Sequence, residues 1–211
     1  MVAGLLSGAD GTRVITEAYQ ETYDHIARDH VSFWHQNDGR NPFQDPTIMW
    51  KNEQATLELI RDYAPKGPML DVGCGMGDLL EKFRYRQRHG IDISEEYLAI
   101  ARKRGFKVTR AAAEDIPFSN DSFEVVVATD ILEHVFDLSR VASELVRVSR
   151  NFIIVRVPYM EYVSWNSPPY KFVHVRIFDE GTLRLLFDPI MGCKVRECFQ
   201  SENVLHLVAQ K

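Results

Sequence analysis

The sequence predicts an α/β fold, namely a seven-stranded and mostly parallel sheet with helices on both faces and a C-terminal antiparallel hairpin. Segments with helical spacing alternate with short apolar runs along the chain, which is typical of parallel strands joined by crossover helices. The run 123–128 is continuous and rich in valine, as expected of a central strand buried on both faces. With 211 residues, of which 45% are hydrophobic, one domain can bury a substantial core.

The predicted elements follow from this spacing and from the residues that interrupt it. Helical spacing over 50–63 stops at Pro65, Gly67 and Pro68, just before a strand at 69–72. The remaining elements are a helix at 78–83, a strand at 89–93, a helix from Ser94 to about Gly105, strands at 107–111 and 123–128, a helix at 137–148, a strand at 152–157 that Pro158 ends, a helix at 178–187 capped by Asp179, and two strands at 194–199 and 204–210.

The segment LDVGCGMGDLL at 70–80 indicates a nucleotide-binding turn between the first strand and the helix after it. Glycines alternate at Gly73, Gly75 and Gly77, so the backbone can turn sharply and a ligand can approach it closely. The following helix would add the positive end of its dipole. The next strand ends at Asp92, whose carboxylate could accept hydrogen bonds from ribose hydroxyls. Because parallel strands end at one edge of a sheet, the turn and Asp92 should face one ligand.

These residues give the chain a resemblance to the class I S-adenosylmethionine (SAM) methyltransferases, whose first motif reads acidic-x-G-x-G-x-G, as Asp71 to Gly77 does. The segment AEDIPFSNDSFEVVVATDILEHV at 113–135 is similar to the methyltransferase type 11 group, which includes small-molecule methyltransferases of ubiquinone biosynthesis. The resemblance covers about 57–211 and implies a Rossmann-like fold, SAM as the cofactor and S-adenosylhomocysteine (SAH) as the product. It also implies a helical N-terminal cover at 1–50 and a SAM-binding domain at 51–211, with a substrate-binding insertion at about 158–178.

The resemblance also assigns cofactor roles residue by residue. Asp71 would support the glycine loop and the amino-acid end of the cofactor, the glycines would lie against the cofactor, and Asp92 would hold the ribose. Many relatives place Asp or Asn where this chain has Ala112, which leaves the adenine to backbone groups or to Glu114 or Asp115. The full expected set is Asp71, Gly73, Cys74, Gly75, Gly77, Asp92, Ile93, Ala112, Ala113, Glu114 and Asp130.

The string DILEH at 130–134 supplies the candidate catalytic residues Asp130 and His134, which His174 joins from later in the chain. Methyl transfer is an in-line displacement from a sulfonium, so it needs alignment, and a base only when the acceptor must lose a proton. His134 is the candidate base, since an unperturbed histidine has a pKa near ~6.5. In an alternative of equal weight, His134 and Glu133 only cap or orient the next helix.

A metal-assisted variant also follows from the resemblance. In ubiquinone-type O-methyltransferases a similar string offers carboxylates and an imidazole to a divalent cation, and the matching residues here are Asp130, Glu133 and His134. The short side chain of Asp130 alters the reach, and three residues in one turn do not by themselves make a metal site. We therefore expect SAM as the cofactor and no divalent metal.

The N-terminal cover and the insertion after the fifth strand are both rich in aromatic residues, and we expect them to select the acceptor. The expected acceptor-binding residues are Tyr23, Trp34, Tyr159, His174 and Arg176. Tyr23 opens a Y-D-x-I-A string that is common at this place in relatives. In the alternative interpretation, the aromatic residues pack onto the sheet and Arg176 pairs with Asp179 or Glu180.

The sequence therefore predicts a SAM-dependent methyltransferase that acts on a small-molecule acceptor, with a hydroxyl oxygen as the expected target. An amine, carboxylate or phosphate target and a catalytically silent SAM-binding module remain alternatives. A nicotinamide-dependent oxidoreductase would need the spacing G-x-G-x-x-G, whereas Leu79 and Leu80 follow Gly77 here.

The resemblance implies a small-molecule methyl acceptor as the partner, with a homodimer left open, and the charge and composition point to no nucleic acid or membrane partner. The net charge of −5 gives no general attraction to nucleic acid, and Arg84, Arg86, Arg88 and His89 are interpreted as a solvated helix end. No run approaches about 18 apolar residues and the first residues lack a basic region, so we expect no membrane association and a cytoplasmic protein. The three cysteines are not spaced for a disulfide framework or a zinc site and should be reduced thiols.

Overall fold

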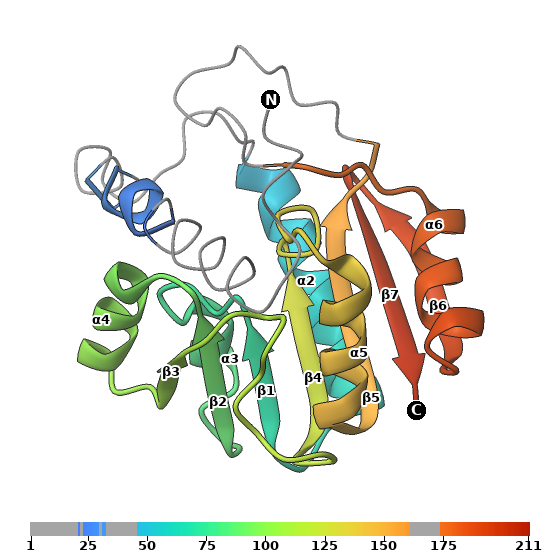
Figure 1. Ribbon diagram of the computed structural model, residues 1–211, viewed down its shortest axis with the longest axis horizontal. Coiled ribbons are helices and arrows are strands. Elements are labelled where there is room, and N and C mark those ends of the chain that lie inside the picture. The colour runs from blue at the N-terminus through green and yellow to red at the C-terminus, as the bar shows by residue number, and fades with distance from the viewer. Residues whose placement is uncertain (1–20, 22, 30, 33–45, 161–173) are drawn as a thin grey trace, which may run out of the picture.

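The computed structural model describes residues 21, 23–29, 31–32, 46–160 and 174–211. Within these residues the strands form a seven-stranded sheet in the order β3-β2-β1-β4-β5-β7-β6, and Figure 1 shows how they lie side by side. The strands are β1 (Met69–Val72), β2 (Arg88–Asp92), β3 (Val108–Arg110), β4 (Phe123–Thr129), β5 (Ser149–Pro158), β6 (Lys194–Ser201) and β7 (Val204–Gln210). Strands β1 to β5 are parallel, and β7 runs antiparallel to both β5 and β6. The predicted fold is confirmed, with β4 at the centre of the sheet.

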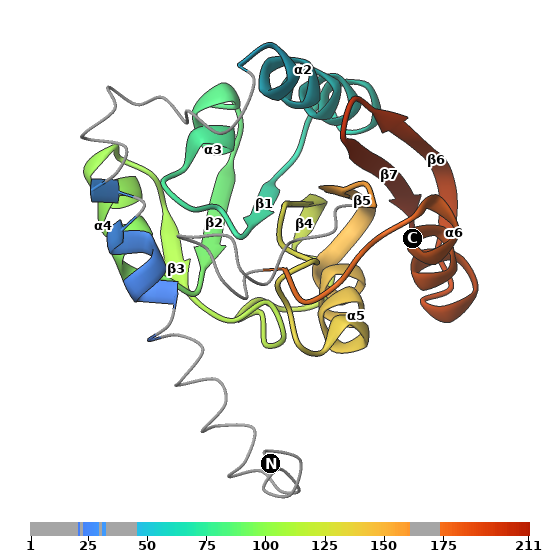
Figure 2. The same ribbon diagram turned by 90° about the horizontal axis from the view of Figure 1, so that it is seen from above.

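Helices cover both faces of the sheet, as Figure 2 shows from above. On one face lie α2 (Pro46–Tyr63), α3 (Asp78–Lys82) and α4 (Glu95–Lys103), and on the other lie α5 (Leu138–Val148) and α6 (Glu180–Leu185). Because side chains alternate along a strand, Val125 and Val127 of β4 enter the core under α2, whereas Val126 enters the core under α5. None of the helices in the described ranges is long and apolar enough to cross a bilayer.

The helix predicted at 178–187 is divided in the structure. After α6 the chain continues as a short π-helix, η1 (Leu186–Ile190). Pro189 lacks the N–H that an α-helical ladder needs, so the helix widens at this point. Asp179 caps α6 as predicted, since its carboxylate accepts a hydrogen bond from the Thr182 N–H at 2.7 Å. The other elements begin and end within four residues of their predicted bounds.

A close contact holds the glycine turn against the sheet. Gly90 of β2 lies opposite Asp71 of β1, and Cys74 packs over it. A Cβ at position 90 would lie 2.5 Å from the Cys74 Sγ and 3.0 Å from the Leu80 Cδ1, so the neighbours would have to move. The absence of a side chain at Gly90 therefore lets the turn lie directly on β2.

Candidate functional site

A cavity of about 300 Å³ opens beside the carboxyl ends of β1, β2 and β4. Ligands bind at such strand ends in open α/β sheets, and this volume is at the lower end of the range for small-molecule sites. Nine predicted site residues line the cavity, namely Tyr23, Gly73, Gly75, Asp92, Ile93, Ala113, Glu114, Asp130 and His134. The motifs from separate strands therefore do converge on one place.

The glycine turn forms one wall of the cavity. Gly73, Gly75 and Gly77 have φ angles of 76°, 50° and 86°, a region that other residues rarely adopt. A Cβ on Gly73 would lie 2.6 Å from the Cδ1 of Ile131, so this glycine allows the loop after β4 to close over the turn. No described atom lies within 4 Å of a Cβ placed on Gly75, which leaves room for a ligand against the backbone.

Asp92, at the end of β2, holds its carboxylate against this turn. Its Oδ2 accepts the Gly75 N–H and its Oδ1 accepts the Ser94 N–H, both at 2.8 Å. Burial raises the pKa of Asp92, and the backbone N–H groups partly oppose that rise. Each carboxylate oxygen has a second lone pair, so the group can still accept hydrogen bonds from a ligand. The geometry suits ribose binding, which stays a prediction.

Asp71 of β1 lies behind the turn and outside the cavity lining. The residue is 1% exposed, and no described group donates a hydrogen bond to its Oδ2. Burial, followed by the nearby charge of Asp92, raises the pKa of Asp71 to about 8, while Arg156 opposes this rise. A buried acceptor without a donor is costly, so this oxygen marks a place where a donor from a ligand or a water molecule fits.

Three other predicted cofactor residues also lie outside the lining. Cys74 is buried against Gly90, and burial raises the pKa of its thiol far above the ordinary range. Gly77 precedes α3, and a Cβ there would lie 2.6 Å from the ring of Phe106. The carbonyl of Ala112 accepts a backbone hydrogen bond that closes a turn. These residues shape the site without facing the cavity.

Seven cavity residues were not assigned from the sequence, namely Ile26, Val72, Ile91, Tyr97, Ala111, Ile131 and Val135. Their side chains carry no charge and form no recognisable motif. They could have been predicted only from their closeness to the strand ends. Tyr97 shows this most clearly, because it lies in the first turn of α4, whose start was predicted at Ser94.

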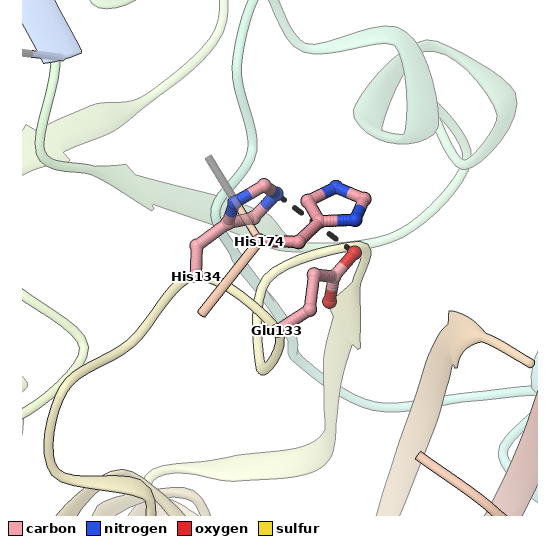
Figure 3. Close-up of side chains that lie close together, drawn as sticks. All are labelled: Glu133, His134 and His174. Atoms are coloured by element: carbon pink, nitrogen blue, oxygen red, sulfur yellow. Dashed lines mark ion pairs between the residues drawn. The ribbon is translucent and has the colours of Figure 1, made fainter. Parts of the chain in front are cut away.

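Two histidines and a glutamate converge beside the cavity (Figure 3). The His134 Nε2 lies 3.8 Å from the Glu133 Oε1, and the ring centroids of His134 and His174 are 4.7 Å apart in an edge-to-face arrangement. Glu133 is buried, and His134 is the member of the group that lines the cavity. The ring of Tyr23 contacts His134 edge-on at 6.0 Å between centroids. An imidazole backed by a carboxylate in this way can take up a proton from a ligand.

Hydrogen bonds to the backbone bring the second histidine to this group from a distant part of the chain. The Val175 N–H donates to the Glu133 carbonyl at 2.8 Å. The guanidinium of Arg176 donates to the carbonyls of Val135 and Phe136. These contacts fasten the last part of the predicted insertion to the loop after β4.

The other expected acceptor residues stand apart from the cavity. Arg176 does not pair with Asp179 or Glu180, because Asp179 caps α6 and Glu180 pairs with an arginine of its own helix at 2.8 Å. Arg176 and Tyr159 both lie outside the cavity lining. Trp34 falls outside the described residues, as does most of the predicted N-terminal cover.

Asp130 lines the cavity, but its carboxylate already forms an ion pair with Arg156 of β5. Its backbone is held at φ 54°, which is uncommon for a residue other than glycine. The groups close enough to share a cation are therefore Glu133, His134 and His174, instead of the set with Asp130 considered from the sequence. Their donor atoms lie within 4.8 Å of one another. Donors about 2.1 Å from a tetrahedral zinc ion lie about 3.4 Å apart, so an ion would draw these side chains closer together.

Comparison with known proteins identifies a family over the middle of the chain. Residues 70–152 match a family described as a methyltransferase domain. The chain is 34% identical over 106 residues to an uncharacterized protein of Methanocaldococcus jannaschii, which covers 50% of this chain and 49% of that protein. It is 36% identical over 95 residues to a ubiquinone biosynthesis O-methyltransferase of Hahella chejuensis, which covers 41% of this chain and 40% of that enzyme. The matched region thus spans no more than half of either relative.

A solved structure shares the fold over most of the chain. It is a SAM-dependent methyltransferase of Thermotoga maritima, described as a possible histamine N-methyltransferase, with a TM-score of 0.68 and 18% identity over 90% of this chain and 98% of that one. At this identity the likeness concerns the fold alone. Residues 70–152 thus match a methyltransferase domain, and the chain shares the fold of a SAM-dependent methyltransferase.

Proposed function

We propose that this domain transfers the methyl group of SAM to a hydroxyl oxygen of a small-molecule acceptor. One observation carries the proposal: His134, an imidazole beside a buried carboxylate, lines the same cavity as the glycine turn and Asp92. A hydroxyl group must lose its proton when it is methylated, so a base in the cavity meets the need of such an acceptor.

The residues around the glycine turn fit SAM as the donor. Asp92 would accept hydrogen bonds from the ribose hydroxyls, and Gly75 leaves room for the cofactor against the backbone. The Oδ2 of Asp71 is an acceptor that no described group uses, and a positive ammonium beside it would lower the raised pKa of Asp71 and favour its charged form. Ala113 and Glu114 line the part of the cavity assigned to the adenine. When bound, SAM supplies a methyl group activated by its positive sulfonium.

The acceptor's proton would go to the imidazole of His134. Glu133, 3.8 Å away, stabilises the positive ring that results. His174 restricts the orientation of that ring by edge-to-face contact, and Tyr23 covers it and excludes water. Asp130 supports the loop that carries these residues through its ion pair with Arg156.

Other classes of acceptor differ in whether their methylation needs a base. A carboxylate or phosphate oxygen carries no proton at neutral pH, so its methylation needs no base, and a silent binding module would form no product at all. We propose that no divalent cation takes part, because the imidazole of His134 beside the Glu133 carboxylate already supplies the base that a hydroxyl acceptor needs. Each of these alternatives predicts a different response to the loss of the His134 imidazole or to a chelator.

Calorimetric titration with SAH, with NAD as the control ligand, tests the cofactor. We expect micromolar binding of SAH and none of NAD. A screen with SAM then follows SAH production from small hydroxyl compounds, each paired with its own methyl ether as a blocked control. Production from the hydroxyl compound and not from its ether supports the proposal. The absence of SAH binding, or equal turnover of the paired compounds, contradicts it.

A further inference from the structure

The residues of the Y-D-x-I-A string at 23–27 lie on different faces of a helix that covers residues 23–29. Tyr23 and Ile26 lie one helical turn apart, and both line the cavity. Ala27 is fully buried, which lets the helix 23–29 pack closely on the domain. His25, between them, is exposed. The helix therefore turns one face toward the cavity, and only Asp24 of the string is left to explain.

Asp24 lies outside the cavity lining and fastens the helix 23–29 to the domain. Its Oδ1 accepts the Glu95 N–H at 2.7 Å, and its Oδ2 accepts an N–H of Arg110 at 2.9 Å. Glu95 is the first residue of α4, where backbone N–H groups have no carbonyl partner within the helix. Arg110 ends β3, and its Nε donates to the carbonyl of Ile93, a cavity residue, at 2.9 Å. One carboxylate thus joins the helix to two elements that border the cavity.

This attachment is better protected from water than the ion pair of Arg28 with Glu96, which also joins the helix to the domain. The side chains of Asp24 and Arg110 are 18% and 37% exposed, whereas those of Arg28 and Glu96, which pair at 3.1 Å, are 55% and 43% exposed. Exposed pairs contribute little because solvent and salt screen them, and partly buried charge-assisted hydrogen bonds keep more of their strength. Within the described residues, Asp24 is the principal polar attachment of this helix.

We propose that Asp24 is a positioning residue that holds the helix 23–29 across the cavity, so that Tyr23 and Ile26 retain a bound cofactor. The proposal rests on the proposed SAM site. Asp24 touches neither ligand nor reacting atom in this account, and it acts by keeping the helix docked. Because Tyr23 also contacts the ring of His134, the same attachment covers the candidate base. Loss of Asp24 should therefore speed cofactor release and raise the acceptor KM more than it lowers kcat.

The test compares Asp24→Asn with the matched control Asp29→Asn in the full chain. Asp29 lies on the same helix and is exposed, and its Oδ2 lies 4.0 Å from the Nδ1 of the exposed His25. Hydrogen exchange of the backbone amides at 23–29 in the ligand-free protein reports the docking of the helix, and stopped-flow displacement reports the rate of SAH release. In Asp24→Asn we expect these amides to exchange about fivefold faster and SAH to leave about tenfold faster, with unchanged exchange in β4. Asp29→Asn should match the wild type in both measurements.

Each failure has its own signature. Wild-type exchange at 23–29 together with wild-type SAH release in Asp24→Asn overturns the role of Asp24 and leaves the proposed function standing. If the wild type binds no SAH, the proposed function fails, and the exchange measurement still decides whether Asp24 holds the helix. Faster exchange in β4 would reveal a general loss of stability, in which case Arg110→Gln decides, because it removes one of the two partners of Asp24. Unchanged exchange at 23–29 in that variant then overturns the proposal.

Discussion

The two sides of the cavity are built in different ways. On the cofactor side, Asp92 is bound by backbone N–H groups at 2.8 Å, and the residues come from the neighbouring ends of β1, β2 and β3. On the acceptor side, Glu133, His134 and His174 meet through side chains at 3.8 to 4.7 Å and come from two segments that are distant in the chain. The first side is preorganised by the sheet itself. The second depends on long-range contacts, so the two should respond separately to mutation.

The largest expected effect separates catalysis from cofactor binding. Replacing His134 by Gln should lower kcat about 100-fold, because it removes the base, and should change the SAH Kd less than about twofold. Steady-state kinetics and calorimetry measure the two quantities, and the exposed His25→Gln serves as the control. A weakened SAH Kd at unchanged kcat would place His134 on the cofactor side instead.

A second variant, at Asp92, tests the contribution of the cofactor side to SAH affinity. Asp92→Ala should weaken SAH binding by about 1.5 to 3 kcal/mol, since a charge-assisted acceptor for the ribose is lost. At saturating SAM its kcat should stay near the wild-type value, because the acceptor side is built elsewhere. Calorimetry of this variant beside Asp62→Ala, an exposed position on α2, gives the comparison. Equal affinities in the two variants would refute the ribose role.

The raised pKa of Asp71, on the cofactor side, makes the stability of the folded chain depend on pH. Burial raises that pKa from 3.8 to about 8, so between these values the folded chain keeps a proton that the unfolded chain has released. Stability must then fall as pH rises through this window, by up to about 1.4 kcal/mol per pH unit. The pKa of buried His206, lowered from 6.5 to about 4, gives the opposite slope below pH 6.5. Urea unfolding between pH 6.5 and 8 should therefore show a decline that Asp71→Asn reduces, while the raised pKa of Asp92 acts in the same direction. The same decline in both proteins would contradict this.

The smallest expected effect is that of a chelator. EDTA should leave kcat and the SAH Kd within about twofold of their untreated values, because the acceptor side works through imidazole and carboxylate groups alone. If EDTA removes the activity and one divalent ion restores it, and if the same ion fails to restore activity in His174→Ala, the acceptor side is a metal site.

The contrast between the two sides also explains what could be predicted from the sequence. The glycines and Asp92 were found because hydrophobic runs reveal where strands end, and ligands bind at those ends. The ion pair of Asp130 with Arg156 was not predicted from the sequence, because it depends on β5 lying beside β4. The position of His174 was not predicted either, since it depends on hydrogen bonds between the residues after it and the carbonyls after β4. The division of the helix after Leu185 follows from Pro189, whose effect on the helix the hydrophobic spacing alone did not show.

The contact between Gly90 and Cys74 has a consequence for how this domain can evolve. The two positions share one small volume, because a Cβ at position 90 would lie 2.5 Å from the cysteine sulfur. A larger residue at 90 is compatible with the turn only if position 74 becomes smaller, so substitutions at the two positions should occur together in descendants of this sequence. A correlation between these two columns would then record shared packing beneath the turn, and it would say nothing about which acceptor is methylated.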